Sequence, residues 1–231
     1  MKYSKTFGQW YDFLMQFLEK PYLRHRRARL LSGLSGRILE VGAGTGINFV
    51  HYNDNTEIIG IEPSPWMIRQ AAERKRQSAL GNRIVLHQTG CGDPALYEMM
   101  EENSLDYVVC TLVLCTIPDA EGALRDFMRW LKPGGQLVVL EHIRSHNKHT
   151  GRLQDALRPV WAKIADGCQL NRPTDRMIAE AGIIPVRQEW FRVGIPFYEG
   201  VFEKRWISTP SPTQTAVDIP PPPAFYCRQQ S

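Results

Sequence analysis

Apolar and polar positions in the central part of the chain follow two alternating patterns. Short apolar runs, each typical of a buried strand, lie at residues 37–42, 57–62, 84–88, 105–114 and 136–142. Between these runs the apolar residues recur at helical spacing, at residues 65–77, at 119–131 and in a stretch that follows the first strand. Strands that alternate with helices pair in parallel through right-handed crossovers. The pattern therefore predicts an α/β domain whose sheet carries helices on both faces.

Beyond the fifth strand the alternation loosens. The remaining patterns predict two helices and then a closing pair of strands, at residues 152–165, 173–181, 186–194 and 196–207. We therefore expect one main domain at residues 36–207, with an insertion at about 143–184.

The two ends of the chain differ from this domain. Residues 6–31 carry apolar side chains at helical spacing, interrupted at Pro21, which predicts an N-terminal helical cap over residues 1–35. The basic run RHRRAR, Arg24–Arg29, fits a solvated helix face, or a weak peripheral contact with anionic lipid. The proline-rich run at residues 208–231 predicts a mobile tail, because proline supplies no ladder donors.

Composition narrows the class of protein. The chain has 231 residues, enough for one sizeable core, and its net charge of +4 is too mild to indicate nucleic-acid binding. Its five cysteines include no C-x-x-C pair, which argues against a disulfide framework and predicts no metal site. No apolar stretch approaches the roughly 18 residues of a membrane span, and no secretory segment is present. We expect a cytoplasmic protein.

A glycine-rich loop follows the first predicted strand. The segment EVGAGTG, residues 40–46, has three glycines whose missing Cβ atoms let the backbone approach a ligand, and the helix expected after it presents free N–H groups. Glu62 ends the second strand, where a carboxylate can accept hydrogen bonds from two ribose hydroxyls. The dinucleotide pattern G-x-G-x-x-G requires glycine where this chain has Ile47. The spacing therefore favours an adenosine-containing ligand other than a dinucleotide.

Several segments together resemble a known family. EVGAGTG, IEPSPWM, SLDYVVCTLVLCTIPD and LKPGGQLVVLEH resemble the class I S-adenosylmethionine-dependent methyltransferases of the type 11 group. CTLVLCTI, the EH after the fifth strand and DGCQLNR are similar to blocks of the methyltransferase-like seven proteins, which are thiol methyltransferases, and of their bacterial relatives. The resemblance implies a Rossmann-like seven-stranded sheet whose last strand is antiparallel, with S-adenosylmethionine as cofactor.

The resemblance also implies roles for particular segments. The loop glycines would cradle the methionine part of the cofactor, Glu62 would hold the ribose, residues 90–92 would lie along the adenine, and Thr111 to Val113 would approach the methionine end. Many relatives have Asp where this chain has Cys91. The expected cofactor-binding residues are Glu40, Gly42, Ala43, Gly44, Gly46, Asn48, Glu62, Pro63, Met67, Gly90, Cys91, Gly92, Thr111 and Leu112.

Candidates for acting on the methyl acceptor lie after the fifth strand and in the insertion. His142 is expected to accept or relay the acceptor's proton, or else to form a structural hydrogen bond at a strand end. Asp166 and Arg172 are read as a base and an anion-holding cation, or as an ion pair that ties down a loop. Cys115 and Cys168 either line the pocket or fill the core.

An aromatic lid is a further possibility. Trp10, Tyr11 and Trp161 would either cover the site or pack in the core.

These observations favour an S-adenosylmethionine-dependent methyltransferase acting on a small molecule, with a small thiol as the leading acceptor. N- or C-methylation of a phospholipid, an amine or a quinone is the alternative. An NAD-dependent oxidoreductase and a non-catalytic cofactor-binding protein are more remote hypotheses.

Overall fold

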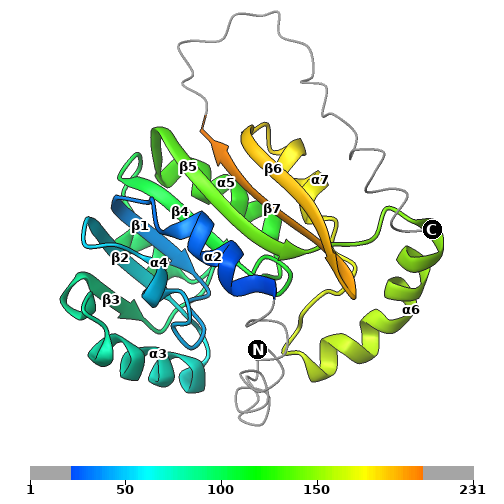
Figure 1. Cartoon of the computed structure of the whole chain (residues 1–231), viewed down its shortest axis with the longest axis horizontal. Helices are drawn as coiled ribbons and strands as arrows, with labels where there is room; N and C mark the ends of the chain where they lie inside the picture. Colours follow the sequence, from blue (N-terminus) through cyan, green and yellow to red (C-terminus); the bar gives the residue numbers. More distant parts are fainter. Residues whose placement is uncertain (1–21, 205–231) are drawn as a thin grey trace, which may run out of the picture.

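The computed structural model describes residues 22–204, which form a seven-stranded sheet with helices on both faces (Figure 1). The strands are β1 Gly36–Val41, β2 Thr56–Ile61, β3 Ile84–His87, β4 Leu105–Thr111, β5 Leu131–His142, β6 Ile184–Val193 and β7 Ile195–Glu203. They lie in the order β3-β2-β1-β4-β5-β7-β6. β1 to β5 pair in parallel, and β7 pairs antiparallel with both β5 and β6. The expected seven-stranded sheet with an antiparallel last strand is confirmed.

The strand order reverses beside β1. From β1 the chain proceeds outward to β2 and β3, and it then returns to place β4 and β5 on the other side of β1. Connections leave the two neighbouring strands in opposite directions at such a switch point, so a crevice opens at their carboxyl ends. The glycine loop after β1 and the segment after β4 both lie at this edge.

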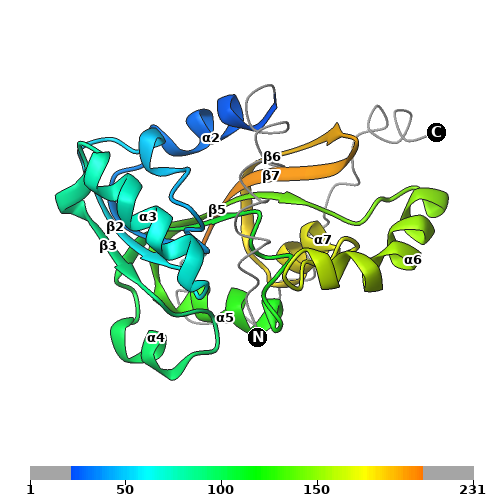
Figure 2. The ribbon, with the colours of Figure 1, turned by 90° about the horizontal axis from the view of Figure 1, so that it is seen from below.

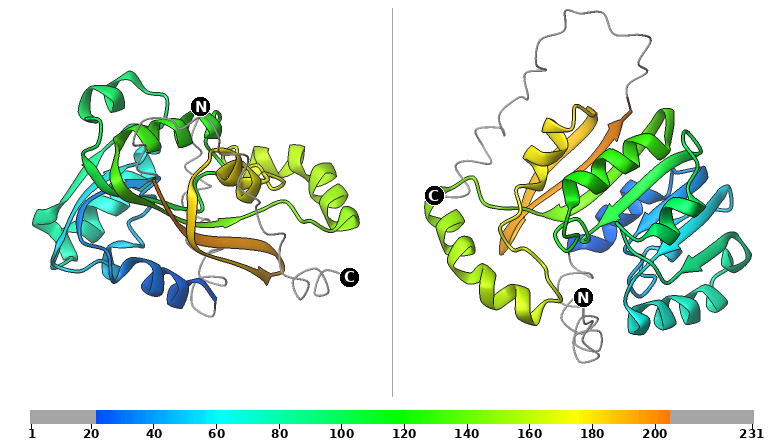
Figure 3. Two further views of the ribbon diagram at one scale, coloured as in Figure 1. Left: turned by 90° about the horizontal axis from the view of Figure 1, so that it is seen from above. Right: turned by 180° about the vertical axis from the view of Figure 1, so that it is seen from behind.

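Two hydrophobic cores cover the two faces of the sheet. The helices are α2 Arg24–Leu31, α3 Pro65–Gln77, α4 Pro94–Met99, α5 Ala120–Trp130, α6 Lys148–Ile164 and α7 Thr174–Glu180, with short 3-10 turns η2 Phe49–His51 and η3 Gly81–Arg83. Helices α2 and α3 cover one face of the sheet and α5 covers the other (Figures 2 and 3). Leu31 of α2 and Ala71 of α3 share one core with Ile38, while Phe127 of α5 shares the other with Leu39. Successive strand side chains point to opposite faces, which explains how neighbouring residues of β1 belong to different cores.

The local predictions were wrong in two places. The helix expected after the glycine loop is absent, and only η2 forms there, because the chain turns at residues 54–55 and β2 begins at residue 56. Asn53 fixes that turn by donating to the carbonyls of Ser32 and Leu34. Helix α4 was not expected, although Asp93 caps it by accepting a hydrogen bond from the Ala95 N–H.

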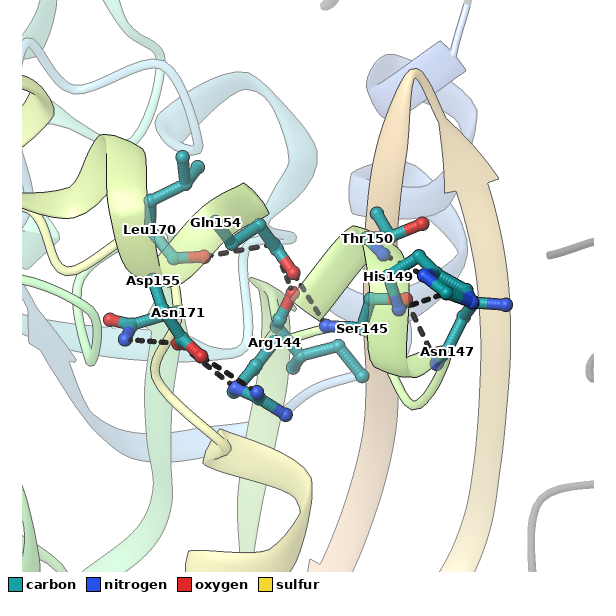
Figure 4. A network of polar contacts seen from close by, with 10 residues as sticks. Arg144, Ser145, Asn147, His149, Thr150, Gln154, Asp155, Leu170 and Asn171 are labelled. Atoms are coloured by element: carbon teal, nitrogen blue, oxygen red, sulfur yellow. Dashed lines mark hydrogen bonds and ion pairs between the residues drawn. The ribbon is translucent and has the colours of Figure 1, made fainter. Parts of the chain in front are cut away.

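The segment after β5 leaves the sheet and returns to it. Helix α6 extends away from the sheet (Figures 1 and 3). Buried Gln154 joins the two limbs of this excursion: its Oε1 accepts from the Ser145 N–H at 2.7 Å, and its Nε2 donates to the carbonyls of Ile143 and Leu170 at 3.1 and 3.0 Å (Figure 4). The segment that precedes residue 172 is thereby held against the end of β5.

Several predictions fall outside the described residues. These are most of the N-terminal cap, the proline-rich tail, and the lid residues Trp10 and Tyr11. Within residues 22–204, no helix has the length and apolar character needed to cross a membrane.

Candidate active site

A cavity of about 460 Å³ opens at the carboxyl edge of the sheet. Segments that follow β1 to β5 line it, together with the end of α6 and the start of β7. The predicted site residues that line it are Gly42, Gly44, Glu62, Pro63, Met67, Gly90, Cys91, Thr111, Leu112, His142 and Asp166. The fold therefore brings both the cofactor candidates and two acceptor candidates to one space.

Other predicted site residues do not line this cavity. They are Glu40, Ala43, Gly46, Asn48, Gly92 and Arg172. Glu40 and Asn48 are buried beneath the site, and the Arg172 guanidinium donates to the carbonyls of Leu114 and Ile117. Arg172 thus holds the segment after β4 in place rather than facing the cavity.

The Glu62 carboxylate is oriented by backbone donors. Its Oε2 accepts from the Gly44 N–H at 3.0 Å, and its Oε1 accepts from the Ser64 N–H at 2.7 Å. Burial raises the pKa of Glu62, whereas the two backbone hydrogen bonds act in the opposite direction. Each oxygen keeps a lone pair, so the carboxylate can accept further hydrogen bonds from a ligand in the cavity.

A buried polar network supports the floor of the site. Arg27 of α2 is only 2% exposed, and its guanidinium donates to Asn48 Oδ1 at 2.7 Å and to Thr111 Oγ1 at 2.8 Å. Asn48 Nδ2 in turn donates to Glu40 Oε1 at 2.9 Å. Burial raises the pKa of Glu40 to about 7, and Asn48 and Arg27 partly counteract it. The network links α2 to β1 and to Thr111, which lines the cavity.

The basic run Arg24–Arg29 therefore does not lie wholly on the protein surface. Arg27 is buried, which contradicts both the solvated-face and the lipid-contact interpretations for this residue. Arg26 and Arg29 form ion pairs with Glu189 and Glu199, which fasten α2 to the β6–β7 hairpin.

Two cysteine sulfurs and one histidine nitrogen lie close together in the wall of the cavity, away from the glycine loop. His142 ends β5, and its Nε2 lies 3.1 Å from Cys168 Sγ. Cys168 Sγ lies 3.5 Å from Cys115 Sγ, and a backbone hydrogen bond from Gln169 N–H to the Cys115 carbonyl fixes the two segments together. His142 Nδ1 has no hydrogen-bond partner among the described residues. All three side chains line the cavity.

The contacts within this cluster shift its proton affinities. The hydrogen bond with Cys115 and then that with His142 lower the pKa of Cys168, while the same contact raises the pKa of Cys115. Burial lowers the pKa of His142, but the hydrogen bond and negative charge of Cys168 outweigh this, so its pKa is raised. The contact between the two side chains thus lowers the pKa of Cys168 and raises that of His142, as expected when a thiol and an imidazole share a hydrogen bond.

Some of the lining residues were not predicted. Phe197 and Ile195 of β7 line the cavity, and Phe197 pairs with His142 in the antiparallel register. Nothing local in the sequence marks this pairing, since it depends on β7 inserting beside β5. Trp161 of α6 lines the cavity as well. This agrees with one of the two interpretations of that residue, a position beside the site.

Comparison with known proteins identifies the family. The protein-family model that is described as a methyltransferase domain matches residues 15–176 of this chain. The chain belongs to the methyltransferase-domain family. A thiol S-methyltransferase of Rattus norvegicus is 34% identical over 167 residues, which cover 69% of this chain and 66% of the rat protein. The chain thus spans about two thirds of the length of this curated relative.

Two further matches broaden the family. A phosphatidylethanolamine N-methyltransferase of Cereibacter sphaeroides is 27% identical over 157 residues, which cover 67% of this chain and 74% of that protein. The structure of an O-methyltransferase family protein from Burkholderia thailandensis shares the fold, with a TM-score of 0.66 at 14% identity, covering 87% of this chain and 60% of that one. The names of the two sequence relatives give different acceptor atoms, sulfur and nitrogen, so membership of the family does not by itself identify the acceptor.

Proposed function

We propose that this protein transfers a methyl group from S-adenosylmethionine to a small thiol. The observation that supports this best is that one cavity is lined both by Gly44 and Glu62 and by the His142–Cys168 pair. A methyl donor and an acceptor must share one space, because the transfer is an in-line displacement.

The residues present fit the proposed cofactor. A Cβ added at Gly44 would have no heavy atom nearer than 3.8 Å, so the loop leaves open space where the methionine part would lie. Glu62 has lone pairs available for ribose hydroxyls. The cavity of about 460 Å³ lies within the range of roughly 300–1,000 Å³ that is usual for small-molecule sites. S-adenosylmethionine, when bound, supplies an electrophilic methyl group on a sulfonium.

The chain's own residues would prepare the acceptor. A thiol reacts as its thiolate, and His142, whose pKa is raised by its contact with Cys168, would favour that form when it carries a proton. In this proposal Asp166, which lines the same cavity, accepts the thiol proton. Apolar neighbours such as Ile117 and Phe197 exclude water, which strengthens these electrostatic interactions.

The sequence comparisons rank a thiol ahead of an amine. The rat thiol S-methyltransferase is 34% identical to this chain, and the Cereibacter phosphatidylethanolamine N-methyltransferase is 27% identical. N-methylation of a lipid amine, suggested by the Cereibacter relative, therefore ranks second.

A labelled methyl-transfer assay against thiols, amines, phenols and lipids tests the proposal. We expect transfer to small alkyl thiols, and binding of S-adenosylhomocysteine that is lost in Glu62→Ala and Gly44→Val. Glu57→Ala is the matched control. Glu57 is an exposed glutamate of β2, the strand that Glu62 directly follows. Unchanged calorimetric binding in both site variants would show that the cofactor site is wrongly assigned, and transfer only to amines or lipids would overturn the thiol assignment.

A further inference from the structure

Cys115, His142 and Cys168 form a compact set of ligand atoms. They come from the segment after β4, from the end of β5 and from the loop after α6, and one ligand atom from each lies within 4.8 Å of the others. Their chain separations are 53 residues between the cysteines and 26 between His142 and Cys168, so only the fold unites them. The sequence predicted no metal site because the cysteines lack a short spacing.

We propose that Cys115 Sγ, Cys168 Sγ and His142 Nε2 bind one Zn²⁺ ion and leave its fourth position open to the cavity. Two thiolates and an imidazole are a ligand set that zinc accepts, and three protein ligands with one open position characterise catalytic rather than structural zinc sites.

The distances suit such a site. Zn–S bonds of about 2.3 Å and Zn–N bonds of about 2.0 Å at tetrahedral angles place two sulfurs about 3.8 Å apart and a sulfur and nitrogen about 3.5 Å apart. The corresponding separations are 3.5 Å between the sulfurs and 3.1 Å between Cys168 Sγ and His142 Nε2. The third pair, Cys115 and His142, lies within 4.8 Å, so the site forms when the first two pairs open by less than about 0.5 Å and this pair settles at about 3.5 Å, which rotation of the side chains can provide.

The surrounding charges suit a divalent cation. Glu141 is fully buried, and its negative charge acts on both Cys115 and His142. Arg172 is a nearby cation, but its guanidinium is engaged with the carbonyls of Leu114 and Ile117. The two thiolates balance the charge of Zn²⁺, and Glu141, when it is ionised, balances that of Arg172.

The open position gives this site a function, which rests on the proposed thiol methyl transfer. A coordinated thiol is deprotonated outright, so the acceptor's proton leaves to solvent or to Asp166. The acceptor sulfur then forms the new S–CH₃ bond with its electron pair, while the methyl–sulfonium bond breaks and its pair stays on the neutral donor sulfur. In this state the charge that favours the thiolate comes from the cation rather than from protonated His142.

Metal binding can be measured without activity. The full chain, freed of any affinity tag and of bound metal by a chelator, is titrated with Zn²⁺ in competition with a chromophoric chelator, and separately with Co²⁺. We expect one equivalent per chain and, with Co²⁺, the thiolate charge-transfer absorption of a tetrahedral site. Cys115→Ser, Cys168→Ser and His142→Ala should each weaken binding by more than about 100-fold, the upper end for loss of a mere supporting partner.

Cys110→Ala is the matched control. Cys110 is a buried cysteine of β4 that does not line the cavity, so this variant should keep the Co²⁺ spectrum. X-ray absorption of the Zn²⁺-loaded wild-type protein needs no variant, and it should show two sulfur ligands and one nitrogen, with a third sulfur after addition of 2-mercaptoethanol.

Specific results would overturn the proposal. One is a wild-type protein whose affinity for Zn²⁺ is no higher than that of Cys115→Ser. Another is a coordination shell without sulfur. A third is formation of a Cys115–Cys168 disulfide as the only change on exposure to metal in air. A protein that binds Zn²⁺ at this site yet fails to bind S-adenosylhomocysteine would refute the proposed function and leave the metal site standing. Methyl transfer to thiols by a protein that binds no metal would refute the metal site and leave the proposed function standing.

Discussion

The guanidinium of Arg27 donates a 2.7 Å hydrogen bond to Asn48 Oδ1 inside the protein. This bond joins α2 to the segment that follows the glycine loop, and the same guanidinium reaches Thr111 at the end of β4. A charge from a basic run that resembles a surface patch thus supports the floor of the candidate active site.

Replacing Arg27 should destabilise the protein far more than replacing its neighbour Arg24. Arg27→Met leaves Asn48, Thr111 and buried Glu40 without their cationic partner, which we expect to cost about 3–5 kcal/mol. Arg24 is exposed, so Arg24→Met should change the unfolding free energy by no more than about 0.5 kcal/mol. Urea unfolding measures both. Equal effects of the two substitutions would mean that the Arg27 network does not contribute to stability.

Two glycines of the loop should respond differently to alanine. A Cβ at Gly42 would lie 2.3 Å from Val113 Cγ2, and Gly42 has a φ of +64°, so Gly42→Ala should destabilise the fold by about 2–4 kcal/mol. Gly44, with a φ of +56°, has room for a Cβ, so Gly44→Ala should cost only about 1–2 kcal/mol of backbone strain.

The proposed cofactor distinguishes Gly44 further. Because the open space beside Gly44 is where the methionine part would lie, Gly44→Ala should reduce affinity for S-adenosylhomocysteine in a protein that remains folded. Calorimetric titration alongside thermal unfolding tests this. Full affinity in the folded Gly44→Ala variant would place the cofactor elsewhere in the cavity.

The acceptor-side residues should affect turnover rather than cofactor binding. His142→Ala and Asp166→Ala should each lower methyl transfer to a thiol by about 10²–10⁴-fold, the usual range for loss of an acid or base. Affinity for S-adenosylhomocysteine should stay within a few-fold of wild type. If both variants keep full activity, neither side chain acts on the acceptor.

Glu141 should make stability depend on pH. Burial raises its pKa from 4.5 to about 7, although its Oε1 accepts from the Val113 and Leu114 N–H groups. The folded state therefore binds this proton more tightly than the unfolded state, and stability from this group, full below pH 4.5, is lost as the pH rises to about 7.

Glu141→Gln should remove that loss. The amide oxygen can accept the same two hydrogen bonds without ionising, so the variant should be more stable than wild type at pH 8, by up to about 3 kcal/mol. The difference should vanish below pH 4.5. Urea unfolding across this range measures it. A variant less stable than wild type at pH 8 would show that the Glu141 charge is stabilised by its surroundings.

Much of the fold was predictable because its signals are local. Apolar runs of strand length alternate with helical spacing, and a buried parallel strand needs little more than such a run. The prediction of a helix after the glycine loop was wrong for a local reason as well, because the turn at residues 54–55 left no room for it. The glycine loop and Glu62 were predicted to meet because parallel strands place their carboxyl ends at one edge, and the Gly44 N–H does donate to Glu62.

The sequence by itself determined the alternating α/β order and the segments that would form the cofactor site. Only the tertiary structure decided that Arg27 is buried, that Phe197 lies beside His142, and that Cys115, His142 and Cys168 share one cavity wall. Each of these contacts joins residues far apart in the chain. Their partners are selected by how whole elements pack, because that packing sets which distant side chains exclude water together, and no local pattern of residues records it.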